Sequence, residues 1–167
     1  YVNECLDTNW ISSAGRFPGL FEHSFAEYVK TKEAVAVQSG TAALHLCLVC
    51  AGIGHGDEVM LPSLTFIAPI NAVSYTGAIP LFIDSEEESF GLSPEAIETY
   101  INENCDFDGS TVLNRSTGRR IKAIIPVHLM GHSCRMDEIM ATASKYKLTV
   151  IEDAAEAIGA LYKGRQA

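Results

Sequence analysis

Three carboxylates follow a short apolar segment near the C-terminal end of the chain. Residues 148–151 read Leu-Thr-Val-Ile, a pattern typical of a buried strand, and Glu152, Asp153 and Glu156 come just after it. Side chains alternate along a strand, so Glu152 and Asp153 are expected to point in opposite directions. Glu152 is then expected to be structural and paired with a neighbouring cation. For Asp153 the pattern alone leaves two interpretations open, a chemical role and a cap on a following helix.

A turn of small residues between a strand and a helix is the second candidate site. In VQSGTAAL an apolar strand is expected to end at Val37 and a helix to begin at Ala42, with Gly40 in the turn. Backbone N–H groups at a helix start are unsatisfied and lie at the positive end of the helix dipole, so they attract anions. A Ser or Thr N-cap explains the same residues and, on its own, is the simpler interpretation.

The glycine cluster at Gly52, Gly54 and Gly56 does not predict a dinucleotide site. It falls after a helix and before a strand, which is the reverse of the order that a pyrophosphate-binding glycine turn requires. A helix C-cap followed by a tight turn explains these glycines better. No phosphate-loop lysine pattern is present either.

Metal ligation is not expected from the cysteines or histidines. Cys47 and Cys50 have CxxC spacing but lie in an apolar helical segment without a second pair, so they are interpreted as buried structural thiols. Gly131 interrupts the helix that the His128 and His132 pair would need. The five cysteines form an odd set without the density of a disulfide scaffold, which favours a reducing, cytoplasmic location.

Composition and charge exclude several classes of function. The chain has 167 residues, of which 47% are hydrophobic, and this suits one domain or a piece of a larger one. Its net charge of −9, with no basic stripe, argues against nucleic acid as a partner. No segment approaches the roughly 18 apolar residues of a membrane helix, and no leader opens the chain, so no membrane partner is expected.

Strand and helix patterns alternate along the chain. This alternation predicts an α/β fold with a mainly parallel sheet covered on both faces, a three-layer sandwich. The expected strands are 34–37, 58–61, 79–83, 121–127 and 148–151. The expected helices are 19–31, 41–52, 66–76, 93–103 and 135–147. The polar, turn-rich residues 104–120 are expected to form an exposed loop insertion or a small hairpin.

Four motifs in order carry a resemblance to a known family. They are SGTAALHL, GIGHGDEVMLPSLTFIAPINAVSYTGAIPLFID, IKAIIPVHLMGH and VIEDAAEAIGALYKG, and TNWISSAGRFPGLFEHSFAEY is similar to the same family's N-terminal segment. Together they resemble the DegT/DnrJ/StrS sugar aminotransferases, pyridoxal-phosphate enzymes of the aspartate aminotransferase fold type. The resemblance covers nearly the whole chain. It implies an N-terminal segment and helix at 1–33 and part of the cofactor-binding large domain at 34–167.

The resemblance implies a role for each of several residues. Asp153 matches the aspartate that pairs with the protonated pyridine nitrogen of pyridoxal phosphate, and Phe66 matches the aromatic residue that stacks on its ring. Glu156 matches a position, often Gln, that approaches the cofactor's 3′-oxygen. A carboxylate there must be protonated or bridged by solvent to face a phenolate. The match places the cofactor phosphate at Gly40, Thr41 and Ala42, and the sugar nucleotide near Trp10, Ser12 and Ser13.

The family's Schiff-base lysine has no counterpart in this sequence. In the family that lysine lies some way after the DAA motif, which places it beyond Ala167, so no catalytic lysine is assigned here. Lys163 is expected in a surface hairpin and Lys122 at the start of a strand. The absence of a starting Met also predicts that both ends are cut, with the rest of the large domain and a small domain missing. The isolated chain is therefore expected to be inactive and to expose unpaired sheet edges.

Three functional hypotheses remain open. The resemblance favours the N-terminal part of an aminotransferase in cell-surface polysaccharide synthesis, acting on a nucleotide-linked 4-keto-6-deoxy sugar with glutamate as donor. Its closest branch is similar to enzymes for UDP-linked N-acetylhexosamines, and the family implies a homodimer with active sites at the interface. A sugar dehydratase of the same family, with His in place of the lysine, is the second hypothesis. A truncated, non-catalytic binding module is the third. The role of His128, as a core histidine or a supporting residue of the site, is left undecided.

Overall fold

The structure is a computed structural model that describes residues 1–12 and 14–166. The chain divides into two compact units, Tyr1–Gln38 and Ser39–Ala167, and each is described by itself. The division predicted from the resemblance, into 1–33 and 34–167, stays a prediction. Among the described residues no helix combines the length and apolar character needed to cross a membrane.

The N-terminal unit consists of two helices and an extended tail. Helix α2 (Arg16–Val29) corresponds to the helix predicted at 19–31 but begins and ends earlier, and helix α1 (Val2–Asp7) was not predicted. The predicted strand at 34–37 is wrong. Ala36 N–H donates to a Glu22 carboxylate oxygen at 2.8 Å, and Val35 is 71% exposed. A strand is stabilised by its neighbours, and none of the described residues forms a ladder with this segment.

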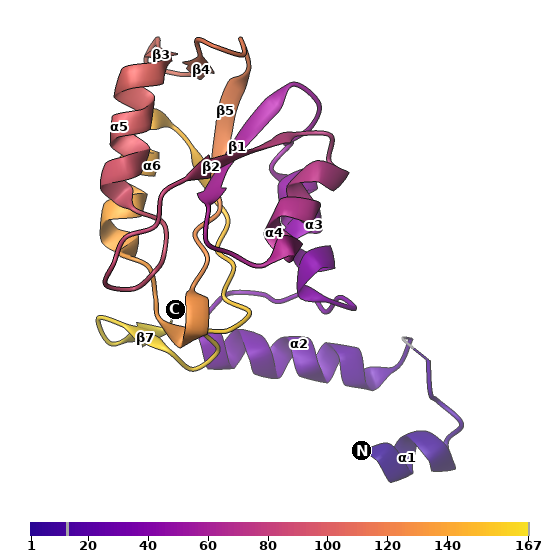
Figure 1. Ribbon diagram of the computed structural model, residues 1–167. Coiled ribbons are helices and arrows are strands. Elements are labelled where there is room, and N and C mark those ends of the chain that lie inside the picture. The colour runs from indigo at the N-terminus through magenta and orange to yellow at the C-terminus, as the bar shows by residue number, and fades with distance from the viewer. Residues whose placement is uncertain (13, 167) are drawn as a thin grey trace. The chain divides into compact units, whose positions relative to one another are not determined.

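The second unit is built on a mixed six-stranded sheet (Figure 1). Its strands are β1 (Asp57–Pro62), β2 (Ile79–Ile83), β3 (Cys105–Phe107), β4 (Val112–Asn114), β5 (Arg120–Ile124) and β6 (Thr149–Val150). Parallel ladders join β2 to β1, β1 to β5, and β5 to β6. The strands predicted at 58–61, 79–83, 121–127 and 148–151 therefore exist, the last two shorter than expected.

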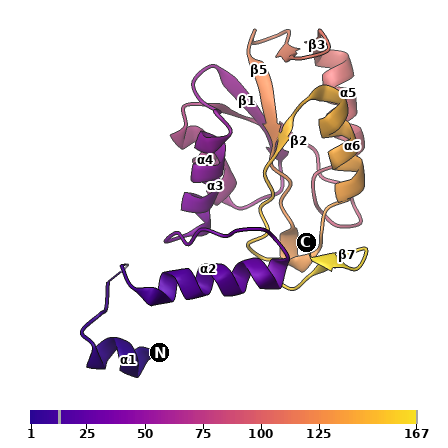
Figure 2. The same ribbon diagram turned by 180° about the vertical axis from the view of Figure 1, so that it is seen from behind.

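Helices cover both faces of this sheet (Figures 1 and 2). One face carries α3 (Gly40–Cys50) and α4 (Ile67–Tyr75), and the other carries α5 (Pro94–Asn104) and α6 (Met136–Tyr146). Alternation along β1 divides the core, because Met60 packs with the α5 and α6 cluster whereas Val59 and Leu61 pack with the α3 and α4 cluster. The predicted three-layer α/β sandwich is confirmed.

Residues 104–120 form the predicted small hairpin, and this hairpin joins the sheet. Strands β3 and β4 form an antiparallel pair, and β4 also pairs antiparallel with β5. Glu58, 2% exposed in β1, ties the hairpin down by accepting hydrogen bonds from Asn114 Nδ2 and Thr117 Oγ1, both at 2.8 Å. A buried carboxylate is tolerated only with such donors, so the hairpin and β1 depend on each other.

The interpretation of Cys47 and Cys50 as buried thiols is wrong, because both are exposed. Helix α3 is apolar on all sides, but only the stripe containing Leu44 and Leu48 is buried. Hydropathy alone could not reveal which side of such a helix faces the sheet. Among the described residues, no group of three or more His, Cys, Asp or Glu side chains is placed to hold a metal ion.

We expect Asn114→Ala to lower the free energy of unfolding by about 2 kcal/mol, because it removes a donor from the buried Glu58 carboxylate. Urea denaturation followed by circular dichroism measures this. The matched control is Asn104→Ala, at an exposed position on α5, with an expected change within about 0.5 kcal/mol. Equal effects of the two substitutions would show that Glu58 does not depend on the hairpin.

Thiol labelling should distinguish the exposed cysteines from the buried ones. Burial raises the pKa of the Cys105 thiol to about 11, so at pH 8 it remains protonated and unreactive. We expect iodoacetamide to modify Cys47 and Cys50 in the native protein, and Cys105 and Cys134 only after denaturant is added. Peptide mass spectrometry reads each site, and rapid native labelling of Cys105 would contradict the burial described here.

Candidate active site

One cavity of the second unit brings together residues from four separate segments. It has a volume of about 310 Å³ and lies at the N-terminus of α3, the start of α4, and the residues after β5 and β6. Carboxyl ends of parallel strands meet at one edge of a sheet, and this edge is where α/β proteins commonly bind ligands. The lining residues are Gly40, Thr41, Leu44, Phe66, Ala68, Val127, His128, Asp153, Ala155 and Glu156.

Five of the six residues predicted to bind a cofactor line this cavity. The exception is Ala42, which lies in the first turn of α3, where its N–H donates to Ser39 Oγ at 3.2 Å. Their binding roles stay predictions, but their placement together is a property of the fold. Leu44, Ala68 and Val127 form apolar walls of the cavity that were not predicted from the sequence. Leu44 could have been predicted, because residues four apart on a helix lie on the same face and Leu44 follows Gly40 by four positions.

The start of α3 has an N-cap residue and also free space beside Gly40. Ser39 is the N-cap, as the simpler interpretation held, and it satisfies only the Ala42 N–H. A Cβ atom at Gly40 would meet no other atom within 4 Å, so packing within the described residues does not require glycine there. The N-cap and an anion at the same helix start are therefore compatible.

Backbone hydrogen bonds fix the segment that carries Asp153. Its N–H donates to Pro126 O at 2.9 Å, and its carbonyl accepts from His128 N–H at 3.0 Å. These bonds extend the β5 and β6 pairing beyond the strands themselves, as a bridge between Val127 and Asp153. The carboxylate is half-buried at the cavity and accepts the Ala155 N–H at 3.1 Å. Asp153 is thus held by the sheet, not by a flexible loop.

Phe66 is an exposed aromatic residue on the cavity wall. It occupies the N-cap position of α4 with extended backbone, and 60% of it is exposed. Core packing within the described residues therefore does not account for this ring. A flat partner stacked on it would remove apolar surface from water.

His128 is a buried histidine whose two ring nitrogens both have partners. Nδ1 accepts the Cys134 N–H at 3.2 Å, so the ring proton is placed on Nε2, which donates to Glu152 Oε2 at 3.1 Å. His128 is fully buried, although its edge belongs to the cavity wall. Glu152 was expected to pair with a neighbouring cation, and the partner that the structure gives it is this imidazole.

Glu156 contacts the turn that follows β5. Its Oε2 accepts the Met130 N–H at 2.7 Å, within the turn that contains the short helix η1 (Leu129–Gly131). The resemblance implied only a cofactor contact for Glu156. The backbone donor of a turn residue has no signature in side-chain chemistry, so the contact could not be read from the sequence.

The residues considered as substitutes for the family lysine lie elsewhere. Lys122, in β5, donates to Gly52 O, and Lys163 is exposed in the hairpin of β7 (Leu161–Tyr162) and β8 (Arg165–Gln166). Lys163 therefore lies in a surface hairpin, as predicted. No lysine is among the described residues that line the cavity.

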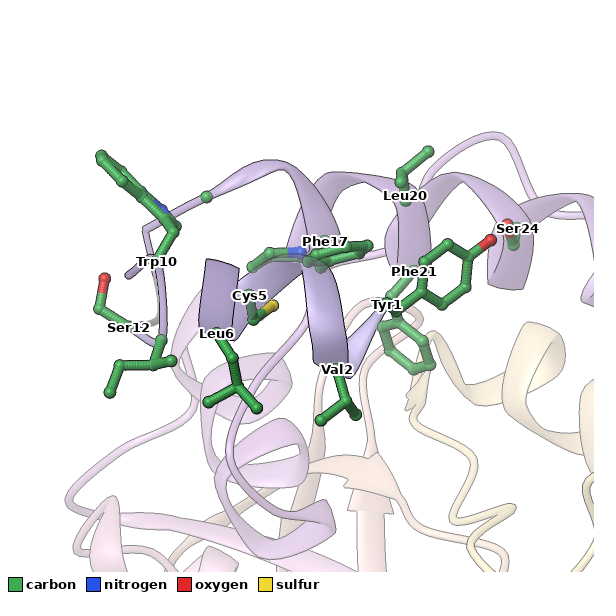
Figure 3. Close-up of a pocket in the computed structure, with 13 residues that line it drawn as sticks. Tyr1, Val2, Cys5, Leu6, Trp10, Ser12, Phe17, Leu20, Phe21 and Ser24 are labelled. Atoms are coloured by element: carbon green, nitrogen blue, oxygen red, sulfur yellow. The ribbon is translucent and has the colours of Figure 1, made fainter. Parts of the chain in front are cut away.

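The predicted sugar-nucleotide residues belong to the N-terminal unit. Trp10 and Ser12 line a mostly apolar pocket of about 680 Å³ between α1 and α2, whereas Ser13 lies outside the described residues. Figure 3 shows Trp10 and Ser12 on the connecting turn, away from the aromatic pair Tyr1 and Phe17, whose ring centroids are 5.0 Å apart. Contact of Trp10 and Ser12 with a substrate stays a prediction.

Comparisons with known proteins identify the family of this chain. The model of the DegT/DnrJ/EryC1/StrS aminotransferase family matches residues 1–167. The chain belongs to this family. Its aminotransferases use pyridoxal phosphate, and the solved relative NtdA from Bacillus subtilis is described with bound cofactor PMP. That structure is 34% identical, with a TM-score of 0.81 over 95% of this chain and 32% of its own.

Other family members are more similar in sequence. GDP-perosamine synthase of Caulobacter vibrioides is 48% identical over 99% of this chain and 40% of its own length. The Escherichia coli O157:H7 protein of the same name is 46% identical over 99% and 41%. A solved aminotransferase from Psychrobacter cryohalolentis is 40% identical, with a TM-score of 0.85 over 99% and 38%. The chain therefore spans about 40% of the length of these curated relatives.

Trp10 provides a test of the turn that carries the predicted substrate residues. Its indole lies across Gly15 so closely that a Cβ atom there would overlap it. We expect Gly15→Ala to displace the chain's only tryptophan, shifting its emission to the red and increasing acrylamide quenching. Gly19→Ala is the matched control, since a Cβ at Gly19 meets nothing within 4 Å. Unchanged emission in Gly15→Ala would contradict this packing.

Proposed function

We propose that this chain supplies one part of the cofactor site of a pyridoxal-phosphate-dependent aminotransferase. Its substrate is a nucleotide-linked 4-keto-6-deoxy sugar, and glutamate is the amino donor. The observation that carries the proposal is the meeting of Gly40, Thr41, Phe66 and Asp153, from separate segments, at one cavity. Family membership supports the reaction class, and the names of relatives support a nucleotide sugar.

The residues present suit the chemistry of this cofactor. A helix start with unused N–H groups suits a phosphate, an exposed phenyl ring suits a flat heteroaromatic ring, and a half-buried carboxylate suits a protonated ring nitrogen. The volume of about 310 Å³ falls at the lower end of the usual range for small-molecule pockets. When bound, pyridoxal phosphate supplies an electron sink that takes up negative charge as a substrate proton leaves.

Each residue has a defined task in this proposal. Gly40 and Thr41 bind the phosphate through their backbone N–H groups, and Phe66 covers one face of the ring and excludes water from it. Asp153 keeps the proton on the pyridine nitrogen, because a partly desolvated carboxylate stabilises the charged form of its partner. The rigid backbone of Asp153 orients the carboxylate without further loss of entropy on binding.

The motifs and the named relatives indicate different nucleotides. The motifs resemble enzymes for UDP-linked N-acetylhexosamines, whereas the relatives from Caulobacter vibrioides and Escherichia coli are named GDP-perosamine synthases. The names of these relatives favour a GDP-linked sugar. Competition between GDP and UDP for binding to the whole protein distinguishes the two.

We also propose that the 167 residues alone do not complete transamination, and that the whole protein acts in the cytoplasm as a homodimer. No lysine of the described part of the chain lines the cavity. Borohydride reduction of the chain with pyridoxal phosphate, followed by intact mass, tests this directly. A lysine adduct that pyridoxamine phosphate competes away would contradict the proposed inactivity.

Pyridoxamine phosphate is the probe for Asp153, because as an amine it needs no lysine for binding. We expect it to bind the chain saturably, and Asp153→Asn to weaken binding by about tenfold or more through loss of one charge-assisted hydrogen bond. Ligand fluorescence measures the affinity. Asp137→Asn, at an exposed position on α6, is the matched control and should leave the affinity unchanged. Equal affinity of the wild type and both variants would remove Asp153 from the cofactor site.

A further inference from the structure

The turn after β5 is held in an uncommon backbone conformation. Met130 has φ 53°, the left-handed region that side-chain-bearing residues rarely adopt, and Gly131 follows with φ 81°. The Met130 residue is 81% exposed, so packing of its own side chain does not compensate for this conformation. The stabilising contacts must come from other groups.

Two carboxylates contact this turn from outside it, and both come from the segment that carries Asp153. Glu156 Oε2 accepts the Met130 N–H at 2.7 Å, and Glu152 Oε2 pairs with His128 Nε2 at 3.1 Å. The backbones also approach closely, because a Cβ atom at Gly131 would lie 3.5 Å from the Glu156 carbonyl oxygen. Residues 128–131 are therefore fastened at both ends to residues 152–156.

We propose that Glu152 and Glu156 are positioning residues that act on the cofactor through this turn. They hold residues 128–131, of which His128 lines the cavity beside Asp153, in the shape that the cofactor requires. The proposal rests on the proposed function and assigns Glu156 a task different from contact with the cofactor's 3′-oxygen. A carboxylate that faced this oxygen as a phenolate would be repelled by it, whereas the Met130 N–H is a favourable partner.

The two roles of Glu156 respond differently to substitution. Glu156→Gln keeps an oxygen that can accept the Met130 N–H but removes the charge, whereas Glu156→Leu removes both. If Glu156 acts through the turn, Gln replaces it and Leu does not. If it acts directly on the cofactor, Gln also changes binding, because it exchanges a negative charge for an amide donor.

The first measurement needs no cofactor. Hydrogen exchange of the Met130 amide, read by NMR in the uniformly labelled chain, should be similar in the wild type and Glu156→Gln and about tenfold faster in Glu156→Leu. Glu103→Leu, at an exposed position on α5, is the control. In the wild type, imidazole nitrogen shifts of His128 should show a proton on Nε2 and none on Nδ1, which needs no variant. Equal exchange rates of the Met130 amide in the wild type and Glu156→Leu would overturn the proposal. The absence of a proton on His128 Nε2 would also overturn it.

The second measurement is the affinity for pyridoxamine phosphate. We expect Glu156→Gln to bind within about twofold of the wild type and Glu156→Leu about tenfold more weakly, the effect of one lost hydrogen bond to a charged group. A tenfold change in Glu156→Gln with an unchanged Met130 amide would instead assign Glu156 to the cofactor directly. Failure of the wild type to bind overturns the proposed function and the cofactor role of the turn, while the exchange rates still decide whether the carboxylates hold it.

Discussion

Parallel strand pairing is the constraint on which the rest of this structure depends. Strands β1, β5 and β6 run in the same direction, so the segments that follow them all emerge at one edge of the sheet. The bridge between Val127 and Asp153 continues that pairing past the last regular ladder and places a carboxylate at the cavity. Because helices cover both faces of the sheet, polar groups gather at its two edges where the strands begin and end, and the cavity lies at the carboxyl edge.

The sequence was sufficient for the layers of the second unit, for physical reasons that act locally. Apolar runs with turns between them identify the buried strands, and Ser93 with Pro94 specifies the start of α5, where Ser93 Oγ accepts the Ala96 N–H at 3.1 Å. The same logic predicts Asp153 directly after a strand, which is where its backbone bridges to Val127. These predictions succeeded because backbone periodicity and capping depend on neighbours within a few residues.

The failures have a different origin. Residues 34–37 have strand composition, but a strand also requires a partner with free N–H and C=O groups, which composition does not encode. The exposure of Cys47 depends on which side of an apolar helix faces the sheet. The contact of Glu156 with Met130 depends on a backbone donor brought close by a left-handed residue. In each case the structure depends on a contact with a segment distant in sequence or with a main-chain group. The pattern of side chains along the sequence does not predict such a contact.

Strand β1 has contrasting surroundings at its two ends. Its amino end carries Asp57 and Glu58, of which Asp57 accepts a hydrogen bond from Arg120 at 2.9 Å and Glu58 is bound by the β3–β4 hairpin. Its carboxyl end leads to Phe66 and the cavity. The full length of the strand therefore separates the inserted hairpin from the chemistry. Evolution, or an engineer adding a label or a fused domain, can alter the tip of the hairpin around Gly109 while the opposite rim of the sheet keeps its geometry.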